Sequence, residues 1–410
     1  MSRRRSCELK AGELITATWA ELARAVDARS AAFSNLPFSR IPSDNTFEQI
    51  VDILAAMRAG VMEVSVDPRS APMADGPVDV GGDAAIVLQT SGTTSQPKGV
   101  VLTHDNLYGN AAAKLAAVPQ SNDDVRLTVL PLSHAYARTS DFGTWLISGC
   151  TLAVTHGFEG LIQLAPLVSP TLMNVVPSIA YRLLQHDLDA IGLERLRLLG
   201  CGGAPISVAA FEQFKRLGVT VIQGYGLTET GPVICSATPD NATAGFVGDF
   251  VDGWEHEIRD GELFVRGPHV MKGYWGDEQA TRNKVDAEGW LRTGDLVQRD
   301  AATGQLQILG RVDDVIVMDN GRKISPSPIE RDVEQLAGVR HAMLVWRTRL
   351  ELWIDGDASE TEIRALLLKH PECRRATVHR FDPPLSIEQG ELTAKGTIRR
   401  KVVQRRYAGS

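Results

Sequence analysis

Glycine, hydroxyl and lysine residues gather in the stretch LQTSGTTSQPKGV, residues 88–100. The stretch follows AAIVLQ, an apolar run typical of a buried strand, and α/β sheets bind ligands in loops at the carboxyl ends of their strands. Glycines let backbone N–H groups approach a ligand, hydroxyls can donate to phosphate oxygens, and Lys98 adds a positive charge. The composition is equally typical of a solvated linker, and the Walker A spacing is not present. A phosphate loop and a linker therefore both remain open.

Five further stretches place chemically useful residues at predicted strand ends or turns. LLGCGGAP holds three glycines, and GYGLTETGP holds an aromatic ring, a hydroxyl and a carboxylate. WLRTGDL presents Asp295 and GRVDDVI presents Arg311. ELTAKGTIRR holds a lysine beside a glycine. Each alone has an ordinary explanation, because glycine-rich strand ends form tight turns and a turn aspartate often bonds its own backbone. Their order along one chain is the informative observation.

The elements that would position these residues alternate between helix and strand. A helix is predicted over residues 18–33, with Thr18 and Glu21 as a capping box, and a second over 46–59, capped by Asn45 and ended by Gly60. Helices are also expected from about residue 104 and over 208–217. Short β-branched runs lie between the helical stretches: AAIVLQTS, RLTVLPL, TLAVTH, TLMNVVP, LRLLGCGG and VTVIQGYG. This pattern predicts an α/β fold with mostly parallel, buried strands.

The pattern of predicted elements changes twice after this region. Residues 245–310 contain short strands separated by Gly, Asp and Pro turns, which predicts a small β-rich subdomain. After Arg311 about a hundred residues form a further compact unit. We therefore expect a large N-terminal domain, 1–310, of mostly parallel sheets flanked by helices and including the β-rich subdomain, and a smaller α+β C-terminal domain, 311–410.

Composition excludes several classes of function. The 410 residues carry a net charge of −7, which argues against nucleic acid or an anionic membrane as the main partner but allows small anionic ligands. The five cysteines are scattered and include no C-x-x-C pair, so no disulfide framework or cysteine metal site is expected. The start MSRRRSCELK has no apolar segment behind its charges, and no run of eighteen apolar residues occurs. The expected location is the cytoplasm.

Six motifs in order, SGTTSQPKG, PLSHAYA, GCGGAP, YGLTETGP, RTGDL and GRVDDVI, resemble those of the adenylate-forming superfamily. This superfamily includes acyl-CoA synthetases, adenylation domains of peptide synthetases and luciferases, and the resemblance extends from about Thr18 to Arg400. It implies an AMP-forming ligase that uses ATP and Mg²⁺ to join a carboxylate to the α-phosphate with release of pyrophosphate. The acyl group would then pass to the thiol of CoA or of a carrier-protein pantetheine. The small C-terminal domain would be mobile between the two steps.

The resemblance also implies a role for individual residues. The β- and γ-phosphates would contact Thr90, Ser91, Gly92, Thr93, Thr94 and Lys98, and adenine would lie against Gly202, Gly203, Ala204, Pro205 and Tyr225. Thr228 would bind the α-phosphate, Glu229 would hold Mg²⁺, and Asp295 and Arg311 would bind the ribose side. His134 matches a gating residue and Asp313 the hinge. The acyl pocket is expected near His134, Pro177, Ser178, Tyr181, Gly226 and Cys235, where no cation is evident, so a monocarboxylic aryl or aliphatic acid is the expected substrate.

The chain departs from the family pattern at both ends. The position of the usual catalytic lysine holds Thr397, and Lys395, two residues earlier, is expected to replace it because a long side chain can cover that offset. The region ahead of the phosphate loop is abbreviated, which affects the expected acyl pocket and the dimer surface, so an oligomer is left open. These departures keep two alternatives in view. One is an adenylating enzyme that activates a non-carboxylate anion such as nitrite or transfers the acyl group to an amine, and the other is a nucleotide-binding protein without turnover.

Overall fold

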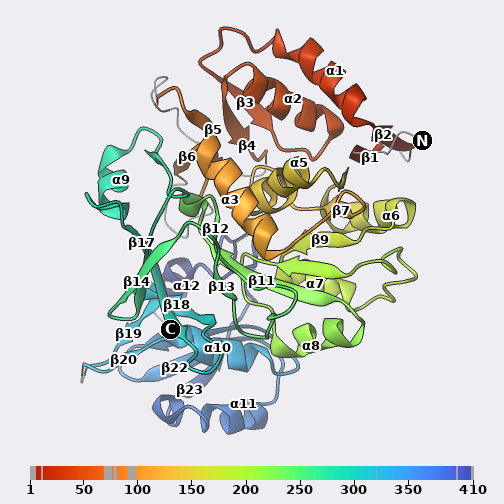
Figure 1. The fold of residues 1–410 in the computed structure, drawn as a ribbon. Coiled ribbons are helices and arrows are strands. Elements are labelled where there is room, and N and C mark those ends of the chain that lie inside the picture. Colours follow the sequence, from red (N-terminus) through yellow and green to blue (C-terminus); the bar gives the residue numbers. More distant parts are fainter. Residues whose placement is uncertain are drawn as a thin grey trace. The chain divides into compact units, whose positions relative to one another are not determined.

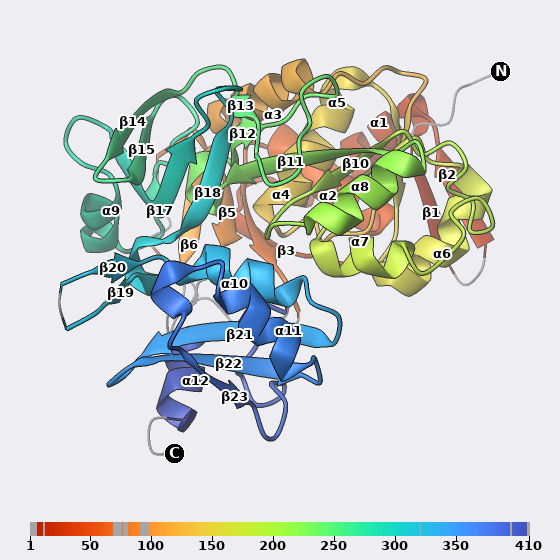
Figure 2. The same cartoon turned by 90° about the horizontal axis from the view of Figure 1, so that it is seen from below.

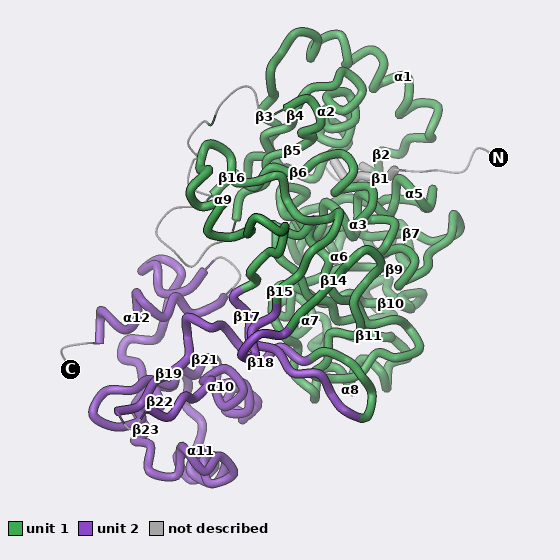
Figure 3. Tube along the Cα trace, turned by 60° about the vertical axis from the view of Figure 1, so that its left-hand side comes forward, with its two compact units in different colours: residues 1–257, 264–293, 302–306 green, residues 258–263, 294–301, 307–410 purple. Residues whose placement is uncertain are grey.

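A computed structural model describes residues 6–10, 13–68, 76, 81–90, 98–319, 321–393 and 396–407. The chain divides into two compact units, coloured separately in Figure 3. Unit 1 comprises residues 1–257, 264–293 and 302–306, and unit 2 comprises 258–263, 294–301 and 307–410. Three short pieces of the expected β-rich subdomain, 258–263, 294–301 and 307–310, thus group with the C-terminal part of the chain.

A nine-stranded sheet runs through unit 1, in the order β13-β12-β11-β10-β9-β7-β8-β1-β2 (Figure 1). The pairs from β11 through β10, β9, β7 and β8 to β1 are all parallel, as the buried apolar runs predict. The strands are Ser6–Lys10 (β1), Glu13–Ala17 (β2), Val125–Thr128 (β7), Thr151–Val154 (β8), Leu172–Val175 (β9), Leu198–Cys201 (β10), Thr220–Gly226 (β11), Val233–Ser236 (β12) and Asp249–Phe250 (β13). Helices of this part are His104–Ala117 (α3), Ala135–Ala137 (α4), Thr144–Ser148 (α5), Gly157–Val168 (α6), Pro177–Leu183 (α7) and Val208–Arg216 (α8).

A five-stranded sheet, in the order β16-β6-β5-β4-β3, carries the phosphate-loop candidate. Its strands are Phe38–Pro42 (β3), Met62–Val66 (β4), Ala84–Gln89 (β5), Gly99–Thr103 (β6) and Gly273–Tyr274 (β16), and the helices Trp19–Ser30 (α1) and Phe47–Arg58 (α2) lie beside it in sequence. Strands β3, β4 and β5 are parallel, whereas β5 and β6 form an antiparallel pair around residues 90–98. The glycines and hydroxyls of the opening motif therefore connect two neighbouring strands of one sheet.

The predicted helix caps are confirmed at α1 and corrected at α2. Thr18 and Glu21 form the capping box of α1. The N-cap of α2 is Thr46, whose hydroxyl accepts from the N–H of Gln49, and not Asn45 as predicted. Asn45 is buried and uses its amide to donate to the carbonyls of Leu130 and Thr155, more than 80 residues away. The prediction of Asn45 as the cap was wrong because its side chain bonds distant carbonyls and the next residue, Thr46, caps the helix.

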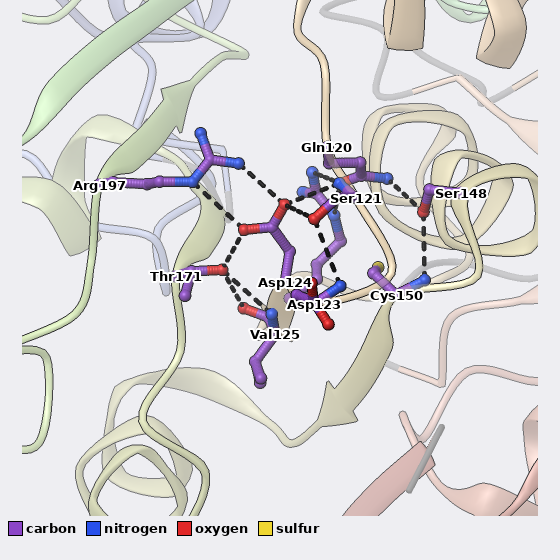
Figure 4. A network of polar contacts seen from close by, with 10 residues as sticks. Gln120, Ser121, Asp123, Asp124, Val125, Ser148, Cys150, Thr171 and Arg197 are labelled. Atoms are coloured by element: carbon purple, nitrogen blue, oxygen red, sulfur yellow. Dashed lines mark hydrogen bonds and ion pairs between the residues drawn. The ribbon is translucent and has the colours of Figure 1, made fainter. Parts of the chain in front are cut away.

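Polar contacts tie together the amino ends of three parallel strands, at the edge opposite the predicted site. Asp124, immediately before β7, accepts hydrogen bonds from Thr171, before β9, and from Arg197, before β10 (Figure 4). Burial opposes ionisation of this carboxyl, but the hydrogen bonds from Arg197, Ser121 and Thr171 outweigh it and lower the pKa of Asp124. The network fixes the start of each strand and leaves the carboxyl ends free for chemistry.

The β-rich segment forms a four-stranded sheet, β14-β15-β17-β18, to which residues of both units belong. Its strands are Glu255–Arg259, Glu262–Arg266, Leu291–Arg299 and Leu306–Arg311, and helix α9 spans Glu278–Lys284. Unit 2 also holds a three-stranded sheet formed by Val339–Trp346 (β21), Leu350–Gly356 (β22) and Thr377–Arg380 (β23) (Figure 2). Its helices are Pro326–Glu334 (α10), Glu360–Leu367 (α11) and Arg400–Tyr407 (α12). A further small strand pair is formed by Ile316–Val317 (β19) and Lys323–Ile324 (β20). The predicted α/β fold class is confirmed.

Candidate active site

The two ends of the predicted phosphate loop are clamped together. The N–H of Thr90 donates to the carbonyl of Lys98 at 2.9 Å, and the N–H of Lys98 donates to Oγ1 of Thr90 at 3.1 Å. These bonds continue the β5/β6 ladder by one residue on each strand. The predicted phosphate contacts Ser91, Gly92, Thr93 and Thr94 lie outside the described residues. The described ends show a loop closed at its base, with a lysine at its exit.

Lys98 stands in a small charged group that sequence reasoning did not assemble. Its Nζ lies 3.4 Å from Asp277 Oδ2 and 4.9 Å from the centre of the Tyr274 ring. The hydroxyl of Tyr274 donates to Glu229 Oε1 at 2.6 Å, so the predicted Mg²⁺ ligand and the predicted phosphate lysine contact the same tyrosine. Burial and the Glu229 carboxylate raise the pKa of Tyr274 well above its usual range, which keeps its proton available as a donor.

The segment carrying Thr228 and Glu229 is a single 3₁₀ turn, residues Thr228–Thr230. The hydroxyl of Thr230, which is fully buried, lies 2.7 Å from the carbonyl oxygen of Pro232 and 2.9 Å from that of Leu227, and it can donate its proton to either. The carbonyl of Glu229 accepts from the N–H of Met271. The backbone of the turn is thereby held at both ends, while the side chains of Thr228 and Glu229 stay partly exposed. This is the arrangement expected of residues that contact a ligand and need fixed positions.

Glycines at the ends of β10 and β11 make room for close approach. A Cβ at Gly202 would lie 2.9 Å from the Tyr136 ring, and one at Gly226 would lie 1.7 Å from the carbonyl oxygen of Pro232. Gly203, with φ of +81°, turns the chain away from the sheet, and Ala204 and Pro205 follow it at the surface. Tyr225, in β11, is half-buried opposite Cys235 of β12. The predicted adenine residues of unit 1 thus lie on two adjacent parallel strands at their carboxyl ends.

Asp295 and Arg311 form an ion pair within unit 2. They lie on β17 and β18, and Nη1 of Arg311 donates to Oδ1 of Asp295 at 2.8 Å. The Asp295 side chain is almost fully buried, whereas that of Arg311 is about half-exposed. The guanidinium packs so closely on Gly294 that a Cβ there would lie 2.7 Å from Nη2. A buried carboxylate held by a partly exposed arginine suits the recognition of vicinal hydroxyls.

The residues expected to line the acyl pocket occupy different environments. Pro177, Ser178 and Tyr181 lie on α7, where Tyr181 is about 40% exposed and its hydroxyl accepts from the N–H of Ser207. Cys235 is fully buried in β12. His134 precedes α4, with Nε2 at 3.8 Å from Asp67 Oδ2. The described contacts do not join all of these residues into one wall, and their role in acid binding stays a prediction.

Helix α3 carries a buried polar stripe that sequence reasoning missed. Asn106, Asn110 and Lys114 repeat every four residues and face inward, with exposures of 6%, 0% and 7%. Asn106 donates to the carbonyls of Pro268 and Val270, Asn110 bonds both backbone groups of Val233, and Lys114 donates to Ser236 Oγ at 2.6 Å. The period of four was visible in the sequence as N-x-x-x-N-x-x-x-K. Lys114 is a buried cation that the sequence analysis did not single out, and the expected absence of a cation near the acyl pocket stays a prediction.

The remaining predicted residues lie near the C-terminal part of the chain. Lys395 lies outside the described residues. On either side of it, the N–H of Thr393 donates to the carbonyl of Thr397, and the N–H of Gly396 donates to the carbonyl of Thr393. Asp313 is exposed in the 3₁₀ turn Val312–Asp314, directly after β18. Its role as a hinge stays a prediction.

Comparison with known proteins identifies relatives of this chain. The family model described as "AMP-binding enzyme" matches residues 72–275, about half of the chain. The protein "4-coumarate--CoA ligase-like 9" of Arabidopsis thaliana is 36% identical over 244 residues, 53% of this chain and 43% of that protein. "Feruloyl-CoA synthase" of Amycolatopsis sp is 30% identical over 283 residues, 64% of this chain and 56% of that protein. The chain thus spans about half the length of the curated relatives that it matches.

Solved structures show the same fold over nearly the whole chain. ATP-bound MatB from Rhodopseudomonas palustris aligns with a TM-score of 0.82 and 22% identity, covering 99% of this chain and 96% of that one. The O-succinylbenzoate coenzyme A synthetase MenE from Bacillus subtilis, in complex with AMP, aligns with a TM-score of 0.80 and 23% identity, covering 98% and 95%. In the part of the chain that the structure describes, the helices are all too short or too polar to cross a bilayer.

Proposed function

This chain belongs to the AMP-binding, adenylate-forming enzymes, and on that premise we propose that it is an ATP-dependent acid-activating ligase. It joins the carboxylate of a small acid to the α-phosphate of ATP, releases pyrophosphate, and transfers the acyl group to the thiol of CoA. In the first step the carboxylate oxygen bonds to the α-phosphorus and the bond from that phosphorus to the pyrophosphate oxygen breaks. In the second, the sulfur attacks the acyl carbon, AMP leaves, and the thiol proton is released.

The Lys98–Tyr274–Glu229 group carries this proposal. It joins the lysine at the exit of the predicted phosphate loop to the carboxylate of the YGLTETGP motif through one tyrosine. The two side chains come from segments about 130 residues apart in the sequence, and both are predicted to serve the same triphosphate. A purely structural ion pair would not require one tyrosine whose hydroxyl donates to the Glu229 carboxylate and whose ring also contacts the Lys98 ammonium. The arrangement suits a polyanion accompanied by a cation.

The residues present fit a magnesium ion, which is a cofactor implied by the family. Glu229 offers a partly exposed carboxylate of the kind that Mg²⁺ prefers, and its orientation is set by Tyr274. No cluster of three or more His, Cys, Asp or Glu suited to a metal occurs among the described residues, so phosphate oxygens and water would supply the other ligands. When bound, the ion would neutralise charge on the phosphates.

The chemical difficulty of the first step is that one anion must attack another. The protein can lower this barrier by holding both reactants and by placing positive charge where negative charge develops. Lys98 would hold the leaving pyrophosphate and Thr228 would donate to the α-phosphate. Lys395 is proposed to approach the acyl carboxylate and the α-phosphate. Asp295, oriented by Arg311, would accept the ribose hydroxyls.

An acid-dependent pyrophosphate-release assay tests the proposed function. The full chain is offered ATP, Mg²⁺ and a panel of aryl and aliphatic acids, with hydroxylamine to trap the acyl-adenylate as a hydroxamate and with CoA, nitrite and amines in parallel reactions. We expect pyrophosphate and hydroxamate to form together with a carboxylic acid, and an acyl-CoA to replace the hydroxamate when CoA is present.

The matched variants for this assay are Glu229→Gln and Glu278→Gln. The first removes the proposed Mg²⁺ ligand and should lower the rate of pyrophosphate release by about a hundredfold or more. The second removes an exposed carboxylate of α9 that pairs with Arg282 at 3.0 Å and should leave the rate unchanged. Tight ATP binding without turnover on any acid would contradict the proposal, as would a product formed only with nitrite or an amine.

A further inference from the structure

A π-helical segment, Arg138–Gly143, joins α4 to α5 without a break. The side chains of its first five residues, RTSDF, are all buried, with exposures of 3% or less. Four of the five are polar or charged, whereas a buried helix normally carries apolar side chains. Short π-helical segments are rare and lie frequently at functional sites. The contacts of these polar side chains therefore indicate what the segment does.

The charged side chains of the segment contact both sheets of unit 1. Nη2 of Arg138 donates to Oε2 of Glu63, on β4 of the five-stranded sheet. Asp141 accepts from Arg126 at 2.7 Å and from Asn174 at 2.6 Å, which lie on β7 and β9 of the nine-stranded sheet. Charged groups thus hold the segment between the two sheets, in addition to apolar packing.

The start of the same helix lies between two predicted site segments. The N–H of Arg138 donates to the carbonyl of His134 at 2.9 Å, so the arginine lies one helical turn after His134. The hydroxyl of Thr139 donates to the carbonyl of Gly231 at 2.7 Å, and Gly231 directly follows the 3₁₀ turn that carries Glu229. The position of the segment therefore sets the position of His134 relative to that turn.

The polar residues of β4 share one face, and this face is turned toward the helix. Glu63 and Ser65 alternate with valines in the strand, and Asp67 follows at the same spacing. All three are buried, with exposures of 1%, 3% and 8%. Asp67 Oδ2 lies 3.8 Å from His134 Nε2, while Glu63 pairs with Arg138. One face of a single strand thus contacts both ends of the first helical turn.

The Glu63–Arg138 pair contributes more to position than to stability. The two side chains are 2% and 3% exposed, and in the described part of the chain Glu63 Oε1 and Arg138 Nη1 have no hydrogen-bond partner. Burial raises the pKa of Glu63, and the Arg138 charge opposes this shift. The hydration lost by two buried charges offsets most of their attraction. The pair nevertheless restricts the helix to the position in which Arg138 reaches β4.

We propose that Glu63 and Arg138 are positioning residues of the adenylation reaction, whose buried pair fixes His134 relative to the turn that carries Glu229. The inference rests on the proposed function, since it assumes that these two segments serve acid activation. It gives a role to the part of the chain ahead of the predicted phosphate loop, where the sequence analysis placed no site residue. A displacement of about 1 Å at a reacting group can lower a rate by about a hundredfold.

Removal of the pair as a unit tests the proposal on the full chain. The variant Glu63→Met/Arg138→Met, called the pair-deleted protein, replaces both charges by apolar groups and leaves no charge unpaired. We expect kcat for acid-dependent pyrophosphate release to fall by at least about tenfold, with KM for ATP changed by less than about twofold. The melting temperature should stay the same or rise. An unchanged kcat with a lower melting temperature would show a purely structural pair and would overturn the proposal.

A double-mutant cycle with His134→Ala tests whether the pair acts through His134. In the His134→Ala background nothing is left to position, so removal of the pair should lower kcat by less than about twofold. An equal loss of kcat in the wild-type and His134→Ala backgrounds would overturn the proposal. Arg138→Lys retains the charge opposite Glu63 and so keeps the proposal testable if the pair-deleted protein does not fold. It should lose less kcat than full removal, again only when His134 is present.

The control is Asp27→Asn/Arg58→Met, which removes an exposed pair between α1 and α2, at 3.0 Å, in the same unit. It should leave kcat and the His134 dependence as in the wild type. A loss of kcat in the control equal to that in the pair-deleted protein would overturn the proposal, because any lost ion pair would then have the same effect.

The failure of the proposed function would give a different result. If no acid releases pyrophosphate, NMR of the full chain with isotope-labelled histidine measures the position of His134 without turnover. The His134 ring signal is assigned by its loss in His134→Gln. We expect this signal to shift or broaden in the pair-deleted protein and in Arg138→Lys, and to stay unchanged in the control. An unchanged His134 signal in the pair-deleted protein would overturn the inference.

Discussion

Lys114 is the residue at which burial and charge conflict most clearly. A lysine in an apolar interior favours its neutral form, and the hydrogen bond to Ser236 does not compensate for the lost hydration. Five alanines surround it on the helix, in the segment NAAAKLAA, so helix formation does not require a lysine there. Lys114 therefore costs stability at a position where the helix itself does not require a charge.

The pH dependence of stability measures this conflict. The folded pKa of Lys114 is about 7 and the ordinary value is 10.5, so between these values the unfolded state binds more protons and the free energy of unfolding rises with pH. Relative to Lys114→Met, the wild type should gain about 2 kcal/mol between pH 7 and pH 9. Denaturant unfolding of both proteins at several pH values measures the difference. A constant difference across this range would mean that Lys114 stays charged in the folded protein.

Asp295 and Arg311 allow a second test at the scale of single residues. Asp295→Asn preserves the shape of the side chain but weakens both the ion pair and the acceptance of two hydroxyls. We expect kcat/KM for ATP to fall by about tenfold to a hundredfold, mostly through KM, with little change in melting temperature. Asp260→Asn, in the exposed turn between β14 and β15, is the control. An unchanged KM for ATP would exclude the predicted ribose contact.

At the scale of elements, α3 is held to the edge of the nine-stranded sheet by polar contacts. Most helices of globular proteins turn an apolar stripe inward, whereas α3 turns Asn106, Asn110 and Lys114 inward. Asn110 accepts from the N–H of Val233 and donates to its carbonyl. The side-chain amide thus makes the two hydrogen bonds that the backbone of a further strand would make with β12 at this residue. The helix that carries Lys114 is thereby fixed in register with the strands of the site.

Asn110→Leu should destabilise unit 1 by about 1–3 kcal/mol, because the buried N–H of Val233 loses its acceptor. The carbonyl of Val233 keeps a second donor, Trp254 Nε1 at 2.9 Å, whereas the carbonyl of Thr230 also loses a long contact, at 3.5 Å, with the Asn110 amide. Thermal and denaturant unfolding measure the change. Asn283→Leu, on the exposed face of α9, serves as the control and should alter stability by less than about 0.5 kcal/mol. A neutral Asn110→Leu would show that Asn110 does not hold the helix.

At the scale of the whole molecule, the chain separates the predicted functions between its two units. The phosphate-loop base and the Lys98–Tyr274–Glu229 group belong to unit 1, and the Asp295–Arg311 pair, Asp313 and the segment with Lys395 belong to unit 2. Each group is organised within its own unit by local contacts. A reaction in two steps can use such a division, because one unit can present different groups to the same bound intermediate.

Lys395→Ala tests this division of labour. We expect acid-dependent pyrophosphate release to fall by about a hundredfold, because a positive charge is lost where negative charge develops. Thioester formation from a supplied acyl-adenylate and CoA should change by less than about threefold. Lys401→Ala, exposed on α12, is the control. If pyrophosphate release is untouched in Lys395→Ala, the lysine assignment is wrong and the reaction depends on another cation.

Local sequence determined the elements of this protein and the order of its motifs. The capping box at Thr18, the stop at Gly60 and the parallel strands follow from hydrogen bonds and periodicities within a few residues, and they were predicted correctly. The fold class followed from the alternation of these elements, and six ordered motifs were sufficient to indicate the family.

The tertiary structure alone decided which side chains meet. Asn45 was predicted as a helix cap because it directly precedes the helical stretch. Its amide instead donates to carbonyls that are distant in the sequence. Tyr274 reaches Glu229 from 45 residues away, and Lys114 donates to Ser236 from 122 residues away. Such contacts depend on packing and burial over the whole unit, and no local pattern encodes them. These side-chain pairs are therefore visible only in the folded chain.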